Sequence, residues 1–149
     1  MDSLDQLCAQ LIKDVNDAIG AAVVNLSSGL PLAVAHTVPY FTQSYLDAVA
    51  AAAVEMFRGN TIRVVEDMLS THRGSMITSH LVKEVQMTTE RTYHFMSVVP
   101  GREDSLLVLI TGKKANLGIG WAAMRRALPK VALLTSERDI SLNVAFSRQ

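Results

Sequence analysis

Residues 106–131 read LLVLITGKKANLGIGWAAMRRALPKV, and this stretch carries the strongest structural signals in the chain. Its first part is wholly apolar, as expected for a central strand that is covered on both faces. Asn116 then caps a helical pattern that extends to about residue 134. One face of this helix holds Leu117, Trp121, Met124, Leu128 and Val131. Because Pro129 lies inside the pattern, we expect a kink or a break near Leu128.

The start of this helix also fits a dinucleotide-binding fingerprint. Gly118, Gly120 and Ala123 match G-x-G-x-x-A after a strand, and Glu137 follows about twenty residues further on. A dinucleotide-binding fold, however, opens with this unit and needs further parallel strands after it. The remaining chain is too short for them, so we interpret the two glycines as allowing the helix to pass close to the sheet.

Three strand-like runs precede this helix, at about 80–89, 92–99 and 105–111. A tight turn at Glu90–Arg91 separates the first two, and the sequence PGRED from Pro100 joins the last two. The first run alternates imperfectly between apolar and polar residues. It therefore predicts a half-exposed strand, at an edge of the sheet or at an interface.

The N-terminal part predicts a helix followed by a hairpin. Apolar residues recur three and four apart over residues 2–18, where Asp2 or Ser3 can cap the helix and Gly20 is expected just past its end. Two strand-like runs then flank Ser27–Ser28–Gly29. We expect Gly29 to adopt a positive φ in the turn, and the first of these two strands to be central.

A long helix is predicted over residues 42–70, where Thr42 or Ser44 can cap its start. At about 100° per residue, its apolar side chains form two stripes. One stripe holds Leu46, Ala50, Ala53, Phe57, Val64 and Met68, and the other holds Ala51, Val54, Ile62, Val65 and Leu69. Glycine costs about 1 kcal/mol relative to alanine in a helix, so Gly59–Asn60 predicts a kink or a division.

The first half of that helix contains DAVAAAAVEMF at residues 47–57. A helix that covers only its own core usually carries large apolar residues on one stripe and charges on the other. Small side chains on several faces instead suggest close packing on more than one side. The alternative is a buried alanine-rich helix in a monomer, since small residues also allow tight packing of a helix on a sheet.

Composition narrows the class of protein. The chain has 149 residues, 49% of them apolar, which suits one compact domain. Its formal net charge is zero and it has no basic stripe, so we do not expect nucleic acid as a partner. We expect no insertion into a membrane and no signal peptide. The single cysteine, Cys8, cannot form an internal disulfide, so we expect a cytoplasmic protein. Because Cys8 lies in a helical apolar pattern, we expect it to be buried or half-buried.

No catalytic, metal or cofactor motif emerges from the sequence. The histidines His36, His72, His80 and His94 are scattered and have no second pair of ligands. The segment TGKKANLG lacks the spacing of a P-loop, and no G-x-S-x-G motif is present. We therefore expect neither a metal site nor a bound cofactor.

The order of helix, two strands, long helix, three strands and helix resembles the Roadblock/LC7 family. Three segments carry the resemblance: AAVVNLSSGLPLAVA at 21–35, SYLDAVAAAAVEMF at 44–57, and the strand and helix of 106–131. The resemblance covers about residues 4–134 and assigns a Roadblock/LC7 domain to residues 1–135. The tail, 136–149, has no counterpart in the family. Its alternating ISLNVAFSRQ, from Ile140, predicts an added strand.

The resemblance implies an α+β fold of the profilin and longin type, with a five-stranded antiparallel sheet in the order 2-1-5-4-3. The long second helix would lie on one face and the terminal helices on the other. It also implies a homodimer or heterodimer, here a homodimer, in which the second helices pack together and the third strands pair across a twofold axis. For this chain, that interface would comprise Ala48, Ala51, Ala52, Val54, Glu55, Ile62, Val82, Glu84 and Gln86.

The function implied by the resemblance is a non-enzymatic dimeric module that binds a small Ras-like GTPase, as activator or scaffold. Bacterial relatives activate a gliding-motility GTPase without an arginine finger. The polar residues of the second helix that could face the GTPase are Glu55, Arg58, Arg63, Glu66 and Asp67. Arg58 as a finger residue is the less favoured interpretation. The alternatives are a structural dimerisation adaptor and a small-molecule sensor with a pocket between sheet and helix.

Overall fold

The structure is a computed structural model that describes residues 3–72 and 80–147, and the side chains of residues 3–71 and 80–135. Its elements in chain order are α1 (Leu4–Asp14), β1 (Ala18–Asn25), β2 (Leu30–His36), α2 (Gln43–Arg58), α3 (Asn60–His72), β3 (Glu84–Thr88), β4 (Thr92–Val99), β5 (Arg102–Gly112) and α4 (Leu117–Ser147).

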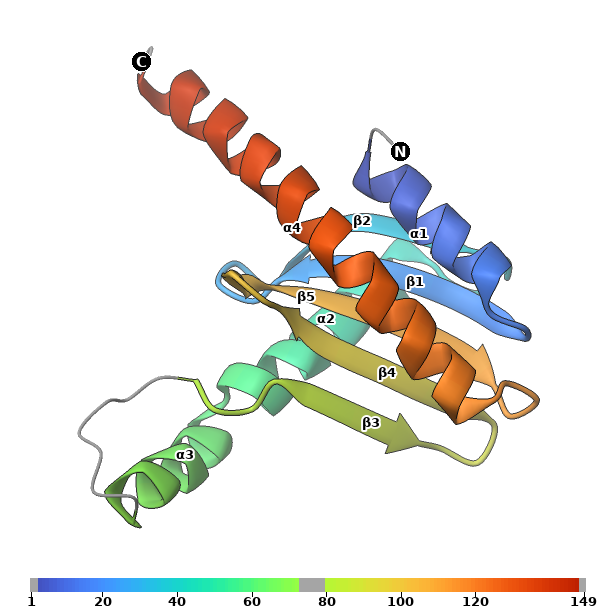
Figure 1. Cartoon of the computed structure of the whole chain (residues 1–149), viewed down its shortest axis with the longest axis horizontal. Coiled ribbons are helices and arrows are strands. Elements are labelled where there is room, and N and C mark those ends of the chain that lie inside the picture. Colours follow the sequence, from blue (N-terminus) through green and yellow to red (C-terminus); the bar gives the residue numbers. More distant parts are fainter. Residues whose placement is uncertain (1–2, 73–79, 148–149) are drawn as a thin grey trace.

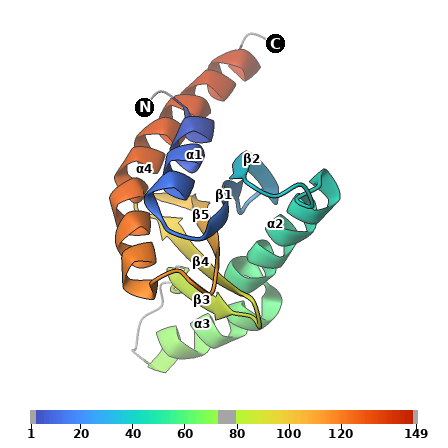
Figure 2. The same cartoon turned by 90° about the vertical axis from the view of Figure 1, so that its right-hand side faces the viewer.

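The five strands form one antiparallel sheet in the order β2-β1-β5-β4-β3, as expected (Figure 1). Figure 2 shows α1 and α4 on one face of the sheet and α2 on the other, with α3 beyond the end of α2. The expected α+β architecture is therefore confirmed. β1 and β5 are central strands, and β3 lies at an edge of the sheet.

Two apolar clusters form the core, one on each face of the sheet. Successive side chains of a strand point to opposite faces, so β4 sends Phe95 to the first cluster and Met96 to the second. The first cluster is closed by α1 and α4, with Leu11 and Met124 among its buried residues. The second is closed by α2, mainly through Phe57.

Local signals fix most element ends. The Ser3 and Thr42 hydroxyls accept from backbone N–H groups at the starts of α1 and α2, and the Asn116 side chain accepts from Ile119 N at 3.0 Å. Gly29 has φ 74°, as expected for the hairpin turn. The expectation for Gly20 was wrong, because α1 ends at Asp14 and Gly20 lies within β1.

The expected division of the long helix is confirmed at Gly59, which is the C-cap of α2. A Cβ at this position would lie 2.4 Å from the carbonyl oxygen of Glu55, so the bend requires glycine. Gly120 likewise permits close packing, since a Cβ there would lie 2.5 Å from the Phe95 ring. Gly118 does not serve this purpose: the nearest atom to its Cβ would be Oδ1 of Asn116, at 3.3 Å.

The C-terminal part of the chain differs from two expectations. α4 continues through Pro129 to Ser147, so the break considered near Leu128 does not occur and the predicted strand was wrong as far as residue 147; residues 148–149 lie outside the described residues. Proline has no N–H group, so the carbonyl of Arg125, four residues earlier, loses its helical hydrogen bond. Because Pro129 is exposed, water can hydrate that carbonyl instead. With no glycine after position 120, the helix meets no further breaker. The domain boundary at residue 135 stays a prediction.

Candidate functional site: the outer face of α2 and α3 and the edge of β3

Helix α2 has one face on the sheet and one face turned away from it. Ala50, Ala53 and Phe57 are at most 1% exposed and pack against the second core cluster. The three alanines predicted for the dimer interface, Ala48, Ala51 and Ala52, are all exposed. A patch of exposed alanines on a helix lets another helix approach closely.

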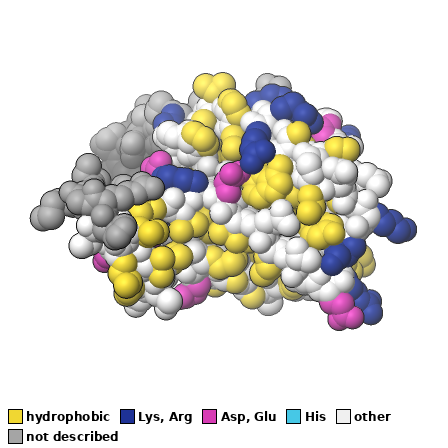
Figure 3. All heavy atoms as spheres, turned by 60° about the horizontal axis from the view of Figure 1, so that its bottom comes forward, with side chains coloured by type: hydrophobic (Ala, Val, Ile, Leu, Met, Phe, Trp, Pro, Cys, Tyr) yellow, Lys and Arg dark blue, Asp and Glu magenta, His cyan; other side chains and the backbone are white. Residues whose placement is uncertain are grey.

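Helix α3 buries polar residues and exposes apolar ones. Its two buried residues within the described side chains are Glu66 and Ser70, at 5% and 6% exposed. Four of its large apolar residues are exposed by between 45% and 68%: Val64, Val65, Met68 and Leu69. In Figure 3 apolar side chains gather at the lower left of the molecule, where α3 lies. We call these four residues the α3 apolar stripe.

The Glu66 carboxylate binds the chain segment that leads into β3. Its Oε2 atom accepts hydrogen bonds from the backbone N–H groups of Leu81 and Val82, the latter at 3.2 Å. A carboxylate that accepts two backbone N–H groups forms strong, charge-assisted bonds. Glu66 therefore fixes α3 to the edge of the sheet, and its burial leaves it little surface for the GTPase contact that the sequence suggested.

The edge strand β3 pairs only with β4 among the described strands, so its other backbone edge is free. Its side chains alternate between the two faces of the sheet. Two residues predicted for the dimer interface point to the α4 face: Gln86 accepts from Trp121 Nε1 at 3.0 Å, and Glu84 pairs with Arg125 at 3.3 Å. Val85 packs on the opposite face, against the second core cluster.

The residues predicted for the dimer interface differ in their exposure and in the face of the sheet on which they lie. Val54, Ile62 and Val82 are half-buried, whereas Glu55 is exposed on α2. Glu84 and Gln86 face away from α2, so only their backbone is placed to pair with another strand. Sequence reasoning did not single out the exposed α3 apolar stripe, although both apolar stripes predicted for residues 42–70 extended through these residues. The place of Glu84 and Gln86 in a dimer interface stays a prediction.

Of the remaining candidates for a GTPase contact, Arg58 is bonded within its own chain, whereas Arg63 and Asp67 are exposed. The Arg58 guanidinium donates to the backbone carbonyl oxygens of Phe57 and Glu103, at 3.2 and 2.5 Å. These bonds hold Arg58 within its own chain, which disfavours a finger role. Arg63 and Asp67 are exposed on α3.

Solved structures of other proteins share this architecture. A Roadblock/LC7 domain from Streptomyces avermitilis matches with a TM-score of 0.67 and 19% identity, over 87% of this chain and 94% of that one. MglB from Myxococcus xanthus matches with a TM-score of 0.66 and 15% identity, over 89% and 94% of the two chains. The gliding protein MglB from Thermus thermophilus gives 0.67 and 19%, over 89% and 87%.

The chain has a Roadblock/LC7 fold. No protein-family model and no curated protein matches the sequence. At identities of 15–19%, the likeness establishes the fold and leaves the partners of this chain to be argued from its own surface.

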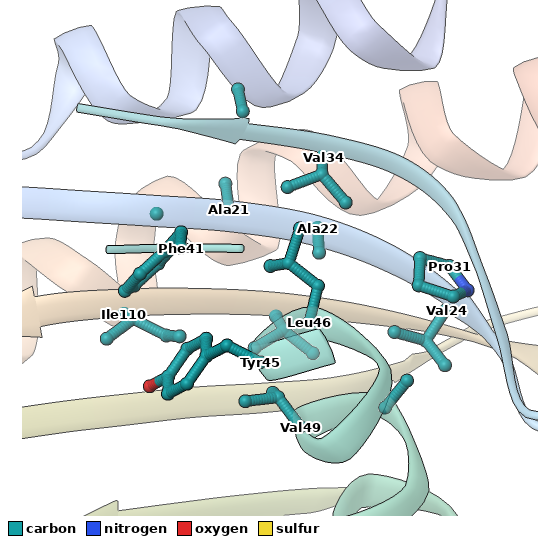
Figure 4. A pocket seen from close by; sticks show the side chains of 14 residues that line it. Ala21, Ala22, Val24, Pro31, Val34, Phe41, Tyr45, Leu46, Val49 and Ile110 are labelled. Atoms are coloured by element: carbon teal, nitrogen blue, oxygen red, sulfur yellow. The ribbon is translucent and has the colours of Figure 1, made fainter. Parts of the chain in front are cut away.

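The Roadblock/LC7 fold of this chain also contains an apolar cleft between α2 and the β1–β2 hairpin (Figure 4). Its interior volume is only about 20 Å³, room for about one water molecule. Leu46 and Val49 of α2 face Ala22 and Val34 of the strands across it (Figure 4). Apart from the hydroxyl of Tyr45 its lining side chains are apolar, so the cleft is a narrow apolar crevice and offers no set of polar ligands.

The described residues also bear on three other kinds of feature: a metal site, a membrane-spanning helix and a reactive cysteine. No group of three or more His, Cys, Asp or Glu side chains in residues 3–71 and 80–135 is placed to hold a metal ion. No described helix is long and apolar enough to cross a membrane. Cys8 is fully buried, and this burial raises the pKa of its thiol to about 12. The thiol is therefore protonated at neutral pH. Cys8 is a core residue, as the helical pattern predicted.

Proposed function

We propose that this chain is a member of the Roadblock/LC7 family that forms a homodimer through α2, α3 and the edge of β3. The observation that carries the proposal is the α3 apolar stripe beside the exposed alanines of α2. Large exposed apolar patches on a folded protein mark interaction sites. A second copy of the chain supplies a self-complementary apolar surface, as a twofold interface requires.

The free edge of β3 supports the same arrangement. An unpaired strand edge is a template for another strand, and proteins usually protect it when it has no partner. Here Glu66 holds α3 next to the segment that leads into this edge. Pairing of two β3 strands and packing of two helical faces therefore become parts of one interface. One solved MglB structure has a tetrameric arrangement, so self-association occurs in this fold.

The dimer is tested by sizing with light scattering. We expect twice the chain mass of 16.2 kDa for the native protein. Replacing both Ala51 and Ala52 with Glu is expected to give a folded monomer, because these side chains are exposed in the protomer. The matched control replaces Ala9 and Ala122 with Glu. Both are exposed on the other side of the sheet, and this variant is expected to stay dimeric. A native monomer, or a dimer that survives the first change, would refute the interface.

We further propose that the dimer regulates or scaffolds a small Ras-like GTPase and is not itself an enzyme. This part rests on the family resemblance. Glu55, Arg63 and Asp67 are its exposed candidate contacts, whereas Arg58 is occupied within the chain. The test is single-turnover GTP hydrolysis by a small Ras-like GTPase captured with this chain from a native lysate, with and without the dimer. We expect faster hydrolysis that Arg58→Ala leaves unchanged.

Two other outcomes separate the alternatives. Binding of the GTPase with no change in hydrolysis rate would favour a structural adaptor. A small-molecule sensor would need the apolar cleft of Figure 4 to widen when its ligand binds, because the cleft lies between sheet and helix but has an interior of only about 20 Å³. An apolar molecule that is retained through purification, identified by mass spectrometry, would support the sensor. Leu46→Trp, which fills the cleft, would then abolish its retention.

A further inference from the structure

A second surface feature lies on the opposite face of the sheet from the proposed dimer interface. Where β4 turns into β5, a broad, open groove of about 540 Å³ runs beside α4. Apolar walls come from Pro100, Leu128, Pro129 and Leu133. Leu133 is 69% exposed, the highest fraction among the large apolar side chains of the described residues. Two arginines, Arg102 and Arg125, complete the lining.

Arg102 enters the groove with an unsatisfied donor. Its Nε atom is buried and has no hydrogen-bond partner among the described residues. Its Nη1 atom donates to the carbonyl oxygen of Gly101 at 2.9 Å. A buried donor without an acceptor destabilises the structure in which it lies. The head of the guanidinium lines the groove, and a carboxylate matches the fork of donors that a guanidinium presents.

Arg125 supplies a second positive charge from α4. Its guanidinium lies 5.3 Å from the ring centre of Trp121 and 3.3 Å from a carboxylate oxygen of Glu84. The side chains of this ion pair are 61% and 41% exposed, so solvent screens it and a second carboxylate can compete for the arginine. The described groove thus combines two arginines with one acidic neighbour.

We propose that this groove binds an acidic, amphipathic segment of a partner protein. A carboxylate of that segment pairs with Arg102 and Arg125, and its apolar side chains pack on Leu128, Leu133 and the two prolines. Arginine beside exposed apolar residues is typical of the centres of protein interfaces. The charge selects an acidic partner, while the apolar walls favour a peptide over a free anion. The residues that line the groove lie outside the proposed dimer interface, so either proposal can fail alone.

Trp121, the single tryptophan of the chain, reports on the groove because Arg125 lies against its ring. The probe is a blocked peptide, acetyl-Leu-Glu-Leu-Asp-Glu-Leu-amide, titrated into the full chain while tryptophan fluorescence is recorded. We expect saturable binding that weakens at least tenfold when the ionic strength rises from about 0.05 M to 0.5 M. The same peptide with Gln and Asn in place of the acidic residues is expected to bind at least tenfold more weakly.

Substitutions in the chain test whether the acidic peptide binds in this groove. Arg102→Gln and Arg125→Gln are each expected to weaken binding of the acidic peptide at least tenfold. The matched control is Arg126→Gln, which removes the same charge from the neighbouring position of α4, where the side chain faces the α1 side. It is expected to leave the affinity within twofold. Arg125 is exposed, so its variant keeps the test valid even if the Arg102 variant folds poorly.

Three results would overturn the proposal. The first is no saturable signal with the acidic peptide at millimolar concentration. The second is equal affinity for the neutral peptide, which would assign the groove to apolar contacts alone. The third is an equal loss of affinity in Arg125→Gln and Arg126→Gln, which would indicate a general effect of net charge.

Discussion

Helices α2 and α3 are separated in sequence only by Gly59, yet they bury opposite kinds of side chain. α2 places Ala53 and Phe57 in the core and leaves small residues outside. α3 buries Glu66 and Ser70 and leaves its apolar stripe in solvent. Burial of apolar area is the main favourable term in folding. α2 therefore stabilises the protomer, whereas the stripe of α3 gains comparable stability only when a second surface covers it.

The largest expected effect is on the inner face of α2. Ala53 is 1% exposed, so Ala53→Glu places an unpaired charge in the core and should cost about 3–5 kcal/mol of unfolding free energy. Ala52→Glu, one residue away on the exposed face, should change the stability of the dissociated protomer by less than about 0.5 kcal/mol. Urea unfolding followed by circular dichroism measures both. Similar losses in the two variants would contradict the assignment of the faces.

The polar side of α3 gives the next effect. Glu66→Ala leaves the N–H groups of Leu81 and Val82 without their acceptor, which should cost about 2–3 kcal/mol. Asp67→Ala, at the exposed neighbouring position, serves as the control and should cost less than about 0.5 kcal/mol. The same urea titrations distinguish them. If the two variants were equally stable, Glu66 would not fix α3 to the sheet.

The joint between the helices should respond more mildly. Alanine at position 59 favours a continuous helix by about 1 kcal/mol, but its Cβ cannot fit 2.4 Å from the Glu55 carbonyl oxygen in the bent form. Gly59→Ala should therefore lower protomer stability by about 1–2 kcal/mol and weaken the dimer by redirecting α3. Gly118→Ala, in the first turn of α4, is the control. An unaltered melting temperature and dimer would show that the bend is not required.

The smallest effect on the protomer is expected at the α3 apolar stripe. Met68 is 68% exposed, so Met68→Ser should change the stability of the dissociated protomer by less than about 0.5 kcal/mol. The same change should weaken the proposed dimer at least tenfold, as measured by dilution in analytical ultracentrifugation. Ile119→Ser removes a 55% exposed apolar residue from α4 and should leave the dimer intact. Equal effects on dimerisation would place the interface elsewhere.

Most of the fold could be predicted from the sequence because its signals are local. The capping side chains of Ser3 and Thr42, and Gly29 in the hairpin, each fix a backbone conformation through neighbouring atoms. The apolar centre of β5 likewise predicts a strand covered on both faces, and Ser105 to Thr111 are all buried. The strand order came from the family resemblance and is confirmed.

Prediction was limited where two patterns fit the same residues. The tail from Ile140 alternates like a strand, but α4 reaches it without interruption, and helix propagation costs less than starting a new strand. In β3 the sequence offered two phases, and the partners Trp121 and Arg125, more than thirty residues away, decide that Glu84 and Gln86 face α4. The role of Glu66 also depends on a contact fifteen residues along the chain.

The bonds from α4 to Glu84 and Gln86 have a consequence for communication across the molecule. Arg125 belongs to both the groove beside α4 and the edge strand, so a carboxylate bound in the groove competes for the same guanidinium that holds Glu84. Linkage between two binding events is reciprocal. Occupation of the groove would therefore loosen the strand through which two protomers are proposed to join, and self-association would in turn change how tightly the groove holds its peptide.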